Sequence, residues 1–309
     1  MKLKQIPEDF IVREKLKLEI NDGNYSYYLL KKINYNTNDA IETIARKLRI
    51  KPKLINAAGL KDKRAITYQY ISIFNGPARD FEFNDIYLEY KGRGKNRINV
   101  GSLDGNHFEI VVRDIKEAPR LVNYVPNYFD QQRFGHDNKN HLIGRLLVKK
   151  DFQGAIELLE EPAVNKHLQK KPNDFVGALR QIPKRKLQFF VSAYQSFLWN
   201  KAIEKYLESS PDKDDKFPVP GFNVEVEAEK KEVLDKVLFR EGIQPREFIN
   251  RRYPELSCDG YERRVFTKIQ DLKVGELEED ELNSANKISV SFFLEKGNYA
   301  TNVISFIFS

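Results

Sequence analysis

The chain has 309 residues, of which 41% are hydrophobic and 31% are charged. This composition excludes a disordered protein, and the length allows two domains or one large domain with an insertion. The net charge of +7 suits an acidic partner such as nucleic acid, although a merely soluble basic surface would give the same value. The single cysteine excludes an internal disulfide and fits a reducing compartment.

Several classes of protein and of site are disfavoured by missing motifs. No segment has the apolar length of a signal peptide or a membrane span, so we expect a cytoplasmic protein without membrane contact. His136 and His141 are five residues apart, which is not the spacing of a helical zinc-ligand pair. A GxxxxGK(S/T) loop, a dinucleotide fingerprint, HExxH and GxSxG are all missing. We therefore expect no metal and no cofactor, and catalysis by side chains on a substrate that positive charge attracts.

The first 115 residues are predicted to contain mostly strands. Apolar and polar residues alternate over 16–20, residues 21–24 have turn chemistry, and residues 25–30 have the composition of a second strand. Together these segments predict a β-hairpin. Further strands are predicted over three segments, 67–74, 98–100 and 108–112. Strands joined by short turns favour an antiparallel sheet over a doubly wound one.

Helical periodicity marks two other parts of the chain. Apolar residues recur every three or four positions over 41–48, and Thr37 or Asn38 can cap the start of this helix. The same period holds from about residue 140 to 205. Within that region, the basic residues 184–186 precede the longest apolar stripe and are a candidate contact for nucleic-acid phosphates.

The last part of the chain returns to strand-like composition. Residues 225–285 are highly charged, and the acidic run over 276–281 is predicted to be a solvated turn. Residues 288–308 then have the apolar pattern of strands. We expect this tail to complete the first sheet, which would make the helical middle an insertion into one domain. The predicted class is α+β, with a mostly antiparallel sheet.

The segment over 56–69 joins a helix to a strand and is dense in polar side chains. Gly59 permits a close approach that a β-carbon would obstruct. Asp62 lies between Lys61 and Lys63, and neighbouring cations favour the ionised carboxylate. An ionised aspartate in a basic groove suits nucleophilic attack on an electrophilic sugar or base carbon. The structural alternative is an aspartate that caps a turn.

Five segments that span almost the whole chain carry a resemblance to a known family. Residues 4–12 read KQIPEDFIV, residues 58–69 read AGLKDKRAITYQ, and residues 125–135 read VPNYFDQQRFG. Residues 297–303 read GNYATNV, and residues 192–200 read SAYQSFLWN. The first four resemble, in the same order, the motifs KxxPEDFxV, AGxKDxxAxTxQ, VPNYFGxQRFG and GS(F/Y)ATxV of the TruD family of pseudouridine synthases. The fifth is similar to the SAxxSxLFN helix of that family.

The resemblance implies a fold and a reaction. It implies a pseudouridine-synthase catalytic domain over 1–145 and 270–309, with a largely helical TruD-type insertion domain over 146–269. The implied reaction is the isomerisation of uridine to pseudouridine in RNA, most directly uridine-13 of tRNA. The glycosidic bond from nitrogen breaks, the base turns, and a carbon of the base bonds to the same ribose, without a metal, nucleotide or redox cofactor. A monomer is the default expectation.

The resemblance also implies the site residues. Asp62 would be the catalytic carboxylate, which either attacks the sugar or abstracts a proton. Lys4 would pair with Asp62 and keep it charged when the site closes around a base. The other expected substrate-binding residues are Phe10, Asn127, Phe129 and Tyr299. The aromatic rings would wall a flipped uracil or stack on it, and the amide would read a uracil edge. Arg133 would contact phosphate or support the loop.

Two alternative functions stay open at this point. A non-catalytic RNA-binding protein could keep the same scaffold and basic groove, although the intact Asp62 argues against it. A nuclease would need clustered carboxylates to hold metal ions, and Asp62 has no close acidic neighbour in the sequence. One departure from the family concerns the RNA substrate. Asp130 stands where the family usually has glycine, and its carboxylate adds negative charge near the expected site.

Overall fold

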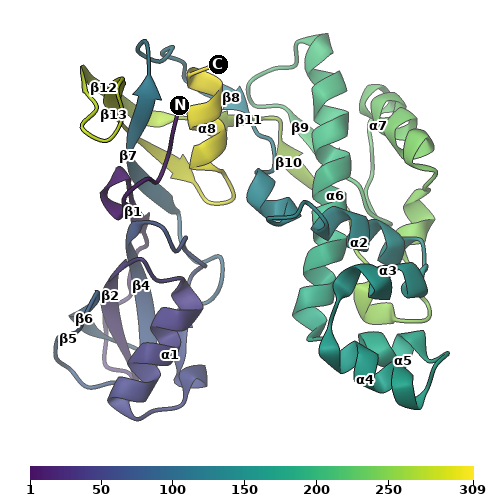
Figure 1. Ribbon diagram of the computed structural model, residues 1–309, viewed down its shortest axis with the longest axis horizontal. Coiled ribbons are helices and arrows are strands. Elements are labelled where there is room, and N and C mark those ends of the chain that lie inside the picture. The colour runs from purple at the N-terminus through teal and green to yellow at the C-terminus, as the bar shows by residue number, and fades with distance from the viewer. The chain divides into compact units, whose positions relative to one another are not determined.

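The computed structural model describes residues 1–309, which divide into two compact units (Figure 1). Unit 1 consists of Met1–Val125 and Lys268–Ser309, and unit 2 consists of Pro126–Thr267. One continuous segment is thus inserted between two parts of unit 1. The sequence prediction placed the corresponding divisions after residues 145 and 269. No helix of the chain combines the length and the apolar character that crossing a bilayer requires.

Unit 1 is built on a nine-stranded sheet in the order β12-β13-β7-β1-β4-β2-β6-β5, with β3 also paired to β4. Its strands are β1 (Phe10–Lys15), β2 (Tyr25–Ile33), β3 (Ile55–Ala57), β4 (Ile66–Phe74), β5 (Phe81–Phe83), β6 (Ile86–Gly94), β7 (Gly105–Ile115), β12 (Gln270–Glu279) and β13 (Asn286–Glu295). Every pair is antiparallel except β1 with β4. The predicted α+β class, the mostly antiparallel sheet and the return of the tail to the first sheet are confirmed.

Two helices cover different parts of this sheet. Helix α1 (Thr37–Leu48) buries Ile44 among the apolar side chains of β2, β4 and β6. Helix α8 (Ala300–Ile307) buries Ile304 among those of β1, β7 and β13. Burying one such side chain stabilises a fold by about 1.5–3 kcal/mol, so these contacts hold the helices to the sheet. The cap of α1 is Asn36, whose side chain accepts a hydrogen bond from the backbone of Asp39, and not Thr37 or Asn38.

The predicted hairpin near the N-terminus is wrong. Strand β1 ends at Lys15 and pairs with β4 and β7, whereas β2 pairs with β4 and β6. Residues 16–20 belong to no strand. Leu16 and Leu18 instead pack against a small apolar cluster that includes Tyr27 and Leu103. Their alternation therefore reflects side-chain burial in an irregular segment and not strand pairing.

Two other predicted strands are also wrong. Residues 98–100 lie outside any strand, although Ile98 is buried and its N–H donates to Ser72 Oγ at 2.9 Å. The end of the tail is the helix α8 and not a strand. Val303, Ile304 and Ile307 fall on one helical face as readily as in a strand, and short apolar runs do not distinguish the two structures.

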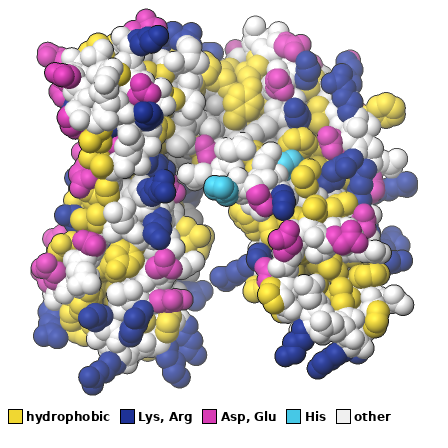
Figure 2. Space-filling view, in the orientation of Figure 1, with side chains coloured by type: hydrophobic (Ala, Val, Ile, Leu, Met, Phe, Trp, Pro, Cys, Tyr) yellow, Lys and Arg dark blue, Asp and Glu magenta, His cyan; other side chains and the backbone are white.

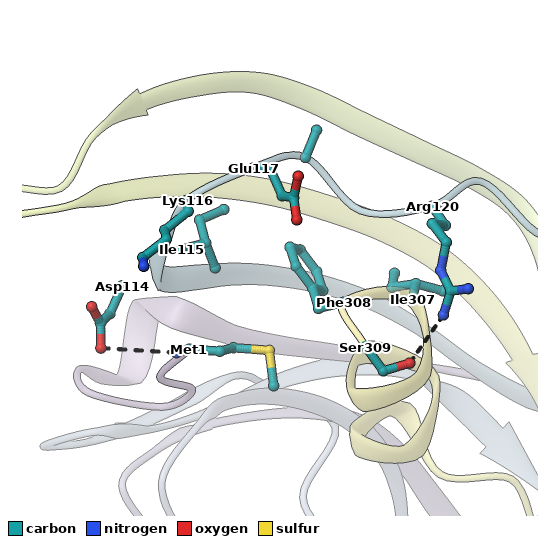
Figure 3. Close-up of a pocket in the computed structure, with 10 residues that line it drawn as sticks. Met1, Asp114, Ile115, Lys116, Glu117, Arg120, Ile307, Phe308 and Ser309 are labelled. Atoms are coloured by element: carbon teal, nitrogen blue, oxygen red, sulfur yellow. Dashed lines mark hydrogen bonds and ion pairs between the residues drawn. The ribbon is translucent and has the colours of Figure 1, made fainter.

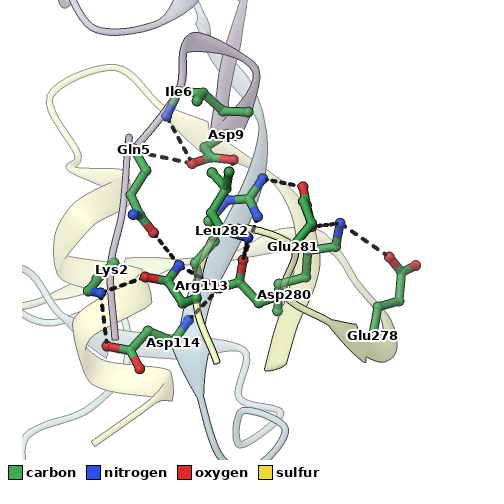
Figure 4. A network of polar contacts seen from close by, with 12 residues as sticks. Lys2, Gln5, Ile6, Asp9, Arg113, Asp114, Glu278, Asp280, Glu281 and Leu282 are labelled. Carbon is green, nitrogen blue, oxygen red and sulfur yellow. Dashed lines mark hydrogen bonds and ion pairs between the residues drawn. The ribbon is translucent and has the colours of Figure 1, made fainter. Parts of the chain in front are cut away.

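Part of the acidic run expected as a solvated turn forms a buried ion-pair network (Figure 4). Arg113 in β7 is 3% exposed and pairs with Asp9 and with Asp280, each at 2.8 Å. It also contacts the exposed Glu281 at 3.0 Å. Burial opposes ionisation of Asp280, but hydrogen bonds from Leu282 and other donors, Arg113 among them, hold its pKa well below the ordinary value. The network ties the N-terminal segment, β7 and the β12–β13 turn together.

We expect Arg113→Met to destabilise unit 1 by about 3–5 kcal/mol, because it leaves two buried carboxylates without their cation. Urea unfolding of the wild type and the variant measures the difference. Arg13→Met is the matched control, since Arg13 forms an exposed pair with Glu109 that contributes under about 1 kcal/mol. Equal losses in the two variants would contradict the expectation.

The same network has a pH dependence of known sign. Hydrogen bonds from Arg113 and Lys287 lower the pKa of Glu281 from 4.5 to about 2. A carboxylate with a lowered pKa stabilises the fold above its ordinary pKa, and this contribution is lost as the pH falls through the lowered value. The difference in unfolding free energy between wild type and Arg113→Met should therefore shrink below about pH 4.

Unit 2 is largely helical, and the helical prediction over 140–205 is confirmed. Its helices are α2 (Asn140–Val148), α3 (Phe152–Leu159), α4 (Pro162–Lys170), α5 (Phe175–Leu179), α6 (Lys184–Tyr206) and α7 (Ala228–Glu241), and its strands are β9 (Lys216–Val219) and β10 (Tyr261–Arg264). The strands β8 (Tyr124–Pro126) and β11 (Phe266–Lys268) span the points where the chain passes between the units. Trp199 of α6 is fully buried. Gly144 lets α2 approach α6 closely, since a β-carbon there would lie 2.0 Å from the carbonyl oxygen of Phe190 in α6.

Candidate active site

Lys4 and Asp62 are brought together by the one parallel strand pair of the sheet. Strands β1 and β4 run side by side with Ile11 opposite Ile66. Lys4 precedes β1 and Asp62 precedes β4. Two neighbouring parallel strands start at the same end of a sheet. The Lys4 ammonium accordingly forms an ion pair with Asp62 Oδ2. The pair that the sequence predicted is present.

The surroundings of this pair differ for its two members. The Lys4 side chain is 15% exposed, whereas that of Asp62 is 37% exposed. The Lys4 ammonium also lies over the ring of Phe10, 4.1 Å from the ring centroid. Phe10 itself is 3% exposed and packs edge-on against Phe108. The cation is therefore enclosed by protein, and the carboxylate faces the exterior, where a substrate could reach it.

The backbone around Lys4 is held by Asp9. Lys4 has a φ of +57°, a left-handed conformation that costs a non-glycine residue about 1 kcal/mol or more. Asp9 Oδ2 accepts hydrogen bonds from the backbone of Gln5 at 3.0 Å and of Ile6 at 3.2 Å. Asp9 Oδ1 accepts from Arg113 at 2.8 Å. The buried network of Figure 4 thereby fixes the turn that presents Lys4.

Buried polar side chains hold the loop before Asp62. Thr37 Oγ1, at the start of α1, accepts from the backbone of Lys61 at 2.8 Å and donates to Gln69 at 3.0 Å. Gln69 Nε2 donates to the Gly59 carbonyl oxygen at 3.2 Å. The Lys61 ammonium pairs with Glu14 at 2.7 Å, and both side chains are almost fully buried. Lys61 thus has a structural partner of its own.

Lys32 of β2 is the residue of this site that the sequence reasoning missed. It is fully buried, and its ammonium donates to the carbonyl oxygens of Asp62 at 2.8 Å, of Lys61 at 3.5 Å and of Tyr35. Burial lowers the pKa of Lys32 from 10.5 to about 8, against the opposing charge of Asp62. The inward alternation that places Leu30 in the core also places Lys32 there. A lysine at a buried strand position was therefore the available signal.

Tyr299 also belongs to unit 1. It is half-buried at the start of α8, where its carbonyl oxygen accepts from the backbone of Val303 at 3.3 Å. Gly297 precedes it with a φ of +83°, a conformation that favours glycine. A cavity of about 550 Å³ near the chain termini (Figure 3) contains none of the predicted site residues.

Asn127 and Phe129 lie in unit 2, where both are buried. The Asn127 amide accepts from Arg263 at 2.5 Å and donates to the Arg264 carbonyl oxygen at 3.1 Å. The Phe129 ring packs edge-on against Trp199 and lies under the Arg263 guanidinium, 4.1 Å from the ring centroid. Both side chains are held by contacts within unit 2.

Helix α6 supports the segment that carries Phe129. Asn200 Oδ1 accepts from the Phe129 backbone at 2.8 Å, and Asn200 Nδ2 donates back to the Phe129 carbonyl oxygen at 2.9 Å. Arg133 donates to the hydroxyls of Ser192 and Ser196, which are the serines of the SAYQSFLWN segment. Asp130 is 7% exposed, and its carboxylate accepts from the Gln132 backbone at 2.8 Å as the cap of a short 3₁₀ helix. The carboxylate that replaces the family glycine therefore has a local structural partner.

The rest of the molecule offers no competing catalytic cluster of metal ligands. No group of three or more His, Cys, Asp or Glu side chains is placed to hold a metal ion. On the face shown in Figure 2, Lys and Arg side chains are spread over both units and interspersed with Asp and Glu. The partly exposed carboxylate of Asp62 beside the enclosed Lys4 ammonium is thus the candidate catalytic group.

A family model described as "tRNA pseudouridine synthase D (TruD)" matches residues 1–165, 157–217 and 215–306 of this chain. The chain belongs to the TruD family. As a member it is a pseudouridine synthase, an isomerase, and the resemblance seen in the sequence is confirmed.

Relatives match the TruD chain over nearly its full length. It is 30% identical to a "Probable tRNA pseudouridine synthase D" of Nanoarchaeum equitans, over 100% of this chain and 98% of that protein. It is also 30% identical to a "tRNA pseudouridine synthase D" of Aquifex aeolicus, with the same coverage. A crystal structure of a putative tRNA pseudouridine synthase D (TruD) from Methanosarcina mazei is similar in fold. The TM-score is 0.78 at 28% identity, covering 99% of this chain and 93% of that one.

Proposed function

We propose that this TruD chain isomerises uridine to pseudouridine in tRNA, at uridine-13, with Asp62 as the catalytic carboxylate. The observation that supports this role most directly is the ion pair between Asp62 and the enclosed Lys4. The RNA substrate is the one named for the relatives. We further propose that unit 1 is the catalytic domain, that unit 2 is the TruD insertion domain, and that the enzyme acts as a cytoplasmic monomer.

The Lys4 ammonium serves to keep Asp62 ionised during the reaction. A uridine that enters the site removes water from the carboxylate, and loss of water favours the neutral acid. A largely enclosed cation at ion-pair distance favours the anion and offsets this effect. Attack on the ribose and abstraction of a proton both begin from an ionised carboxylate. The pair therefore supports either form of the first step.

Five residues are proposed to bind the substrate. They are Lys4, Phe10, Asn127, Phe129 and Tyr299. The target base must leave the RNA stack to reach Asp62, and aromatic rings replace the stacking that it loses. The Asn127 amide has two N–H donors and two acceptor sites. Its contacts with Arg263 and Arg264 use one of each and fix its orientation. One donor and one acceptor then remain to read the edge of a uracil.

A tRNA transcript with labelled uridine tests the proposed function. We expect one pseudouridine per transcript at position 13, formed at the same rate with and without EDTA, because no step of the proposed reaction uses a metal ion. Replacing uridine-13 by cytidine should remove the product. Cleavage of the transcript that stops with EDTA would instead assign a nuclease, and binding without conversion would assign a non-catalytic RNA-binding protein. Conversion at another position would support the proposed reaction but contradict uridine-13 as its target.

A further inference from the structure

A surface cavity of about 400 Å³ in unit 2 gathers four cationic side chains. The residues that line it are Lys150, Arg246, Glu247, Ile249, Arg251 and Arg252. Lys150 follows the end of α2, and the other residues lie between α7 and β10. We call this site the arginine cavity. None of its residues lies in the five segments that match TruD motifs.

The arginine cavity has a local excess of positive charge. The side chains of Arg246, Arg251 and Arg252 are exposed and form no ion pair or hydrogen bond within the chain. The one carboxylate, Glu247, accepts from the backbone of Gln244 at 2.8 Å. Three unpaired cations close together create a positive electrostatic potential at the cavity. An anion that binds there would reduce the repulsion between them.

Several other cations of unit 2 form ion pairs. Lys231 pairs with Asp235 at 2.7 Å, and Lys236 pairs with Glu232 at 2.6 Å. Lys186, in the basic segment singled out from the sequence, pairs with Glu161. Ion pairing with a neighbouring carboxylate is thus available to surface cations of this unit, and the three arginines of the cavity lack it.

A rigid scaffold presents these arginines. Phe248, Asn250 and Tyr253 alternate with them and are buried. The Asn250 side chain accepts from the backbone of Tyr253 at 3.0 Å, and the backbone N–H of Asn250 donates to Ser257 Oγ at 2.9 Å. The Lys150 ammonium donates to the Glu247 carbonyl oxygen, which ties the end of α2 to the same segment. The charged side chains therefore project from a backbone that is fixed before any ligand binds.

We propose that the arginine cavity binds the phosphate backbone of the RNA substrate. This inference rests on the proposed function for the class of RNA. Guanidinium groups present paired donors that match phosphate oxygens, and several of them in one cavity suit adjacent phosphates of a polyanion. Ile249 is 40% exposed among them and offers an apolar contact for a ribose or an unstacked base.

Binding of a tRNA transcript at several salt concentrations tests the proposal. In the triple variant Arg246→Gln, Arg251→Gln, Arg252→Gln, we expect the slope of log K against log salt to flatten by about two units or more, since each lost phosphate contact removes about 0.7–0.9. The matched control is Lys205→Gln, Lys231→Gln, Lys236→Gln, which removes the same charge from exposed, paired lysines of unit 2. The control should change the slope by less than about one unit.

Each outcome decides between clear alternatives. Equal slopes in the two triple variants would overturn the proposal, because the loss would then follow net charge alone. Binding of inorganic phosphate that the arginine variant loses, together with an unchanged salt slope for RNA binding, would assign the cavity to a small anion. This result would also overturn the proposal. The three single substitutions, each expected to remove about one unit at most, replace the triple variant if it fails to fold. Conversion of uridine by the wild type is scored separately, so a failure of the proposed function is distinguished from a failure of this inference.

Discussion

Asp62→Asn is expected to lower the rate of pseudouridine formation at least about 1,000-fold while tRNA binding stays within a few-fold of the wild type. The substitution keeps the shape of the side chain and removes the charge on which nucleophilic attack or proton abstraction depends. The Lys4 ammonium then faces a neutral amide. Single-turnover conversion of a labelled transcript measures the rate, and direct titration of the same transcript measures binding.

Asp22→Asn is the matched control for this experiment. Asp22 is an exposed aspartate of unit 1 in the turn before β2, and its substitution removes the same charge. We expect wild-type turnover from it. Turnover near the wild-type rate in Asp62→Asn would exclude Asp62 as the catalytic carboxylate, whatever the control shows. Loss of binding in Asp62→Asn alone would assign the residue to substrate recognition.

Lys32→Met is expected to lower kcat at least about 100-fold, although Lys32 does not touch the substrate in the proposed reaction. The lysine is a positioning residue, because its ammonium holds the backbone carbonyl oxygens at Lys61 and Asp62. Without that contact the carboxylate loses its fixed place beside Lys4, and misplacing a reacting group by about 1 Å can lower a rate by about 100-fold. The ratio of kcat values, with binding measured separately, checks this expectation.

The global stability of Lys32→Met should change much less than its activity. The lowering of the Lys32 pKa from 10.5 to about 8 corresponds to an unfavourable burial of charge of about 3 kcal/mol, at about 1.4 kcal/mol per pKa unit. The substitution removes this cost but leaves carbonyl oxygens unpaired, at about 1–3 kcal/mol each. These opposing contributions are of similar size when each of the three carbonyl oxygens lies at the lower end of that range, about 3 kcal/mol in all. A large loss of unfolding free energy together with activity would show that Lys32 is needed for the fold as a whole.

A pH profile separates the positioning role of Lys32 from a purely structural one. We expect kcat to fall above about pH 8, where Lys32 loses its proton. Because the folded pKa lies below the ordinary value, the unfolded chain binds more protons between about pH 8 and 10.5, and the contribution of Lys32 to stability rises with pH in that range. The alkaline loss of activity should therefore occur without unfolding. A flat profile up to pH 9.5 would contradict the role.

The sequence predicted the members of the central ion pair but not the geometry that joins them. The motif match named Lys4 and Asp62, whereas their approach depends on the parallel pairing of β1 with β4. That pairing links segments far apart in the chain, and its register follows from packing across the whole sheet. Lys32 was missed for a related reason. Its role depends on a strand position that becomes visible only when the inward face of β2 is known.

The errors in the predicted fold share a physical cause. Leu16 and Leu18 alternate as strand residues do, yet they lie in an irregular segment and pack against a cluster that includes Tyr27. The run near Ile304 is apolar in a pattern that a strand and a helix accommodate equally, and packing on the sheet selects the helix. The acidic run was expected in solvent because its cation, Arg113, is distant in the sequence. A local sequence pattern predicts which side chains are buried more reliably than it predicts the elements that pack over them.

The insertion of unit 2 between β7 and β13 has a consequence for folding during synthesis. Glu109 of β7 lies opposite Ser291 of β13, so one edge of β7 stays unpaired until all of unit 2 has been made. Unit 2 is continuous and can complete its own contacts first. The sheet that carries Asp62 is completed last, when β13 and then α8 have been synthesised. A chain that stops before β13 leaves a long strand edge exposed, which is a template for aggregation.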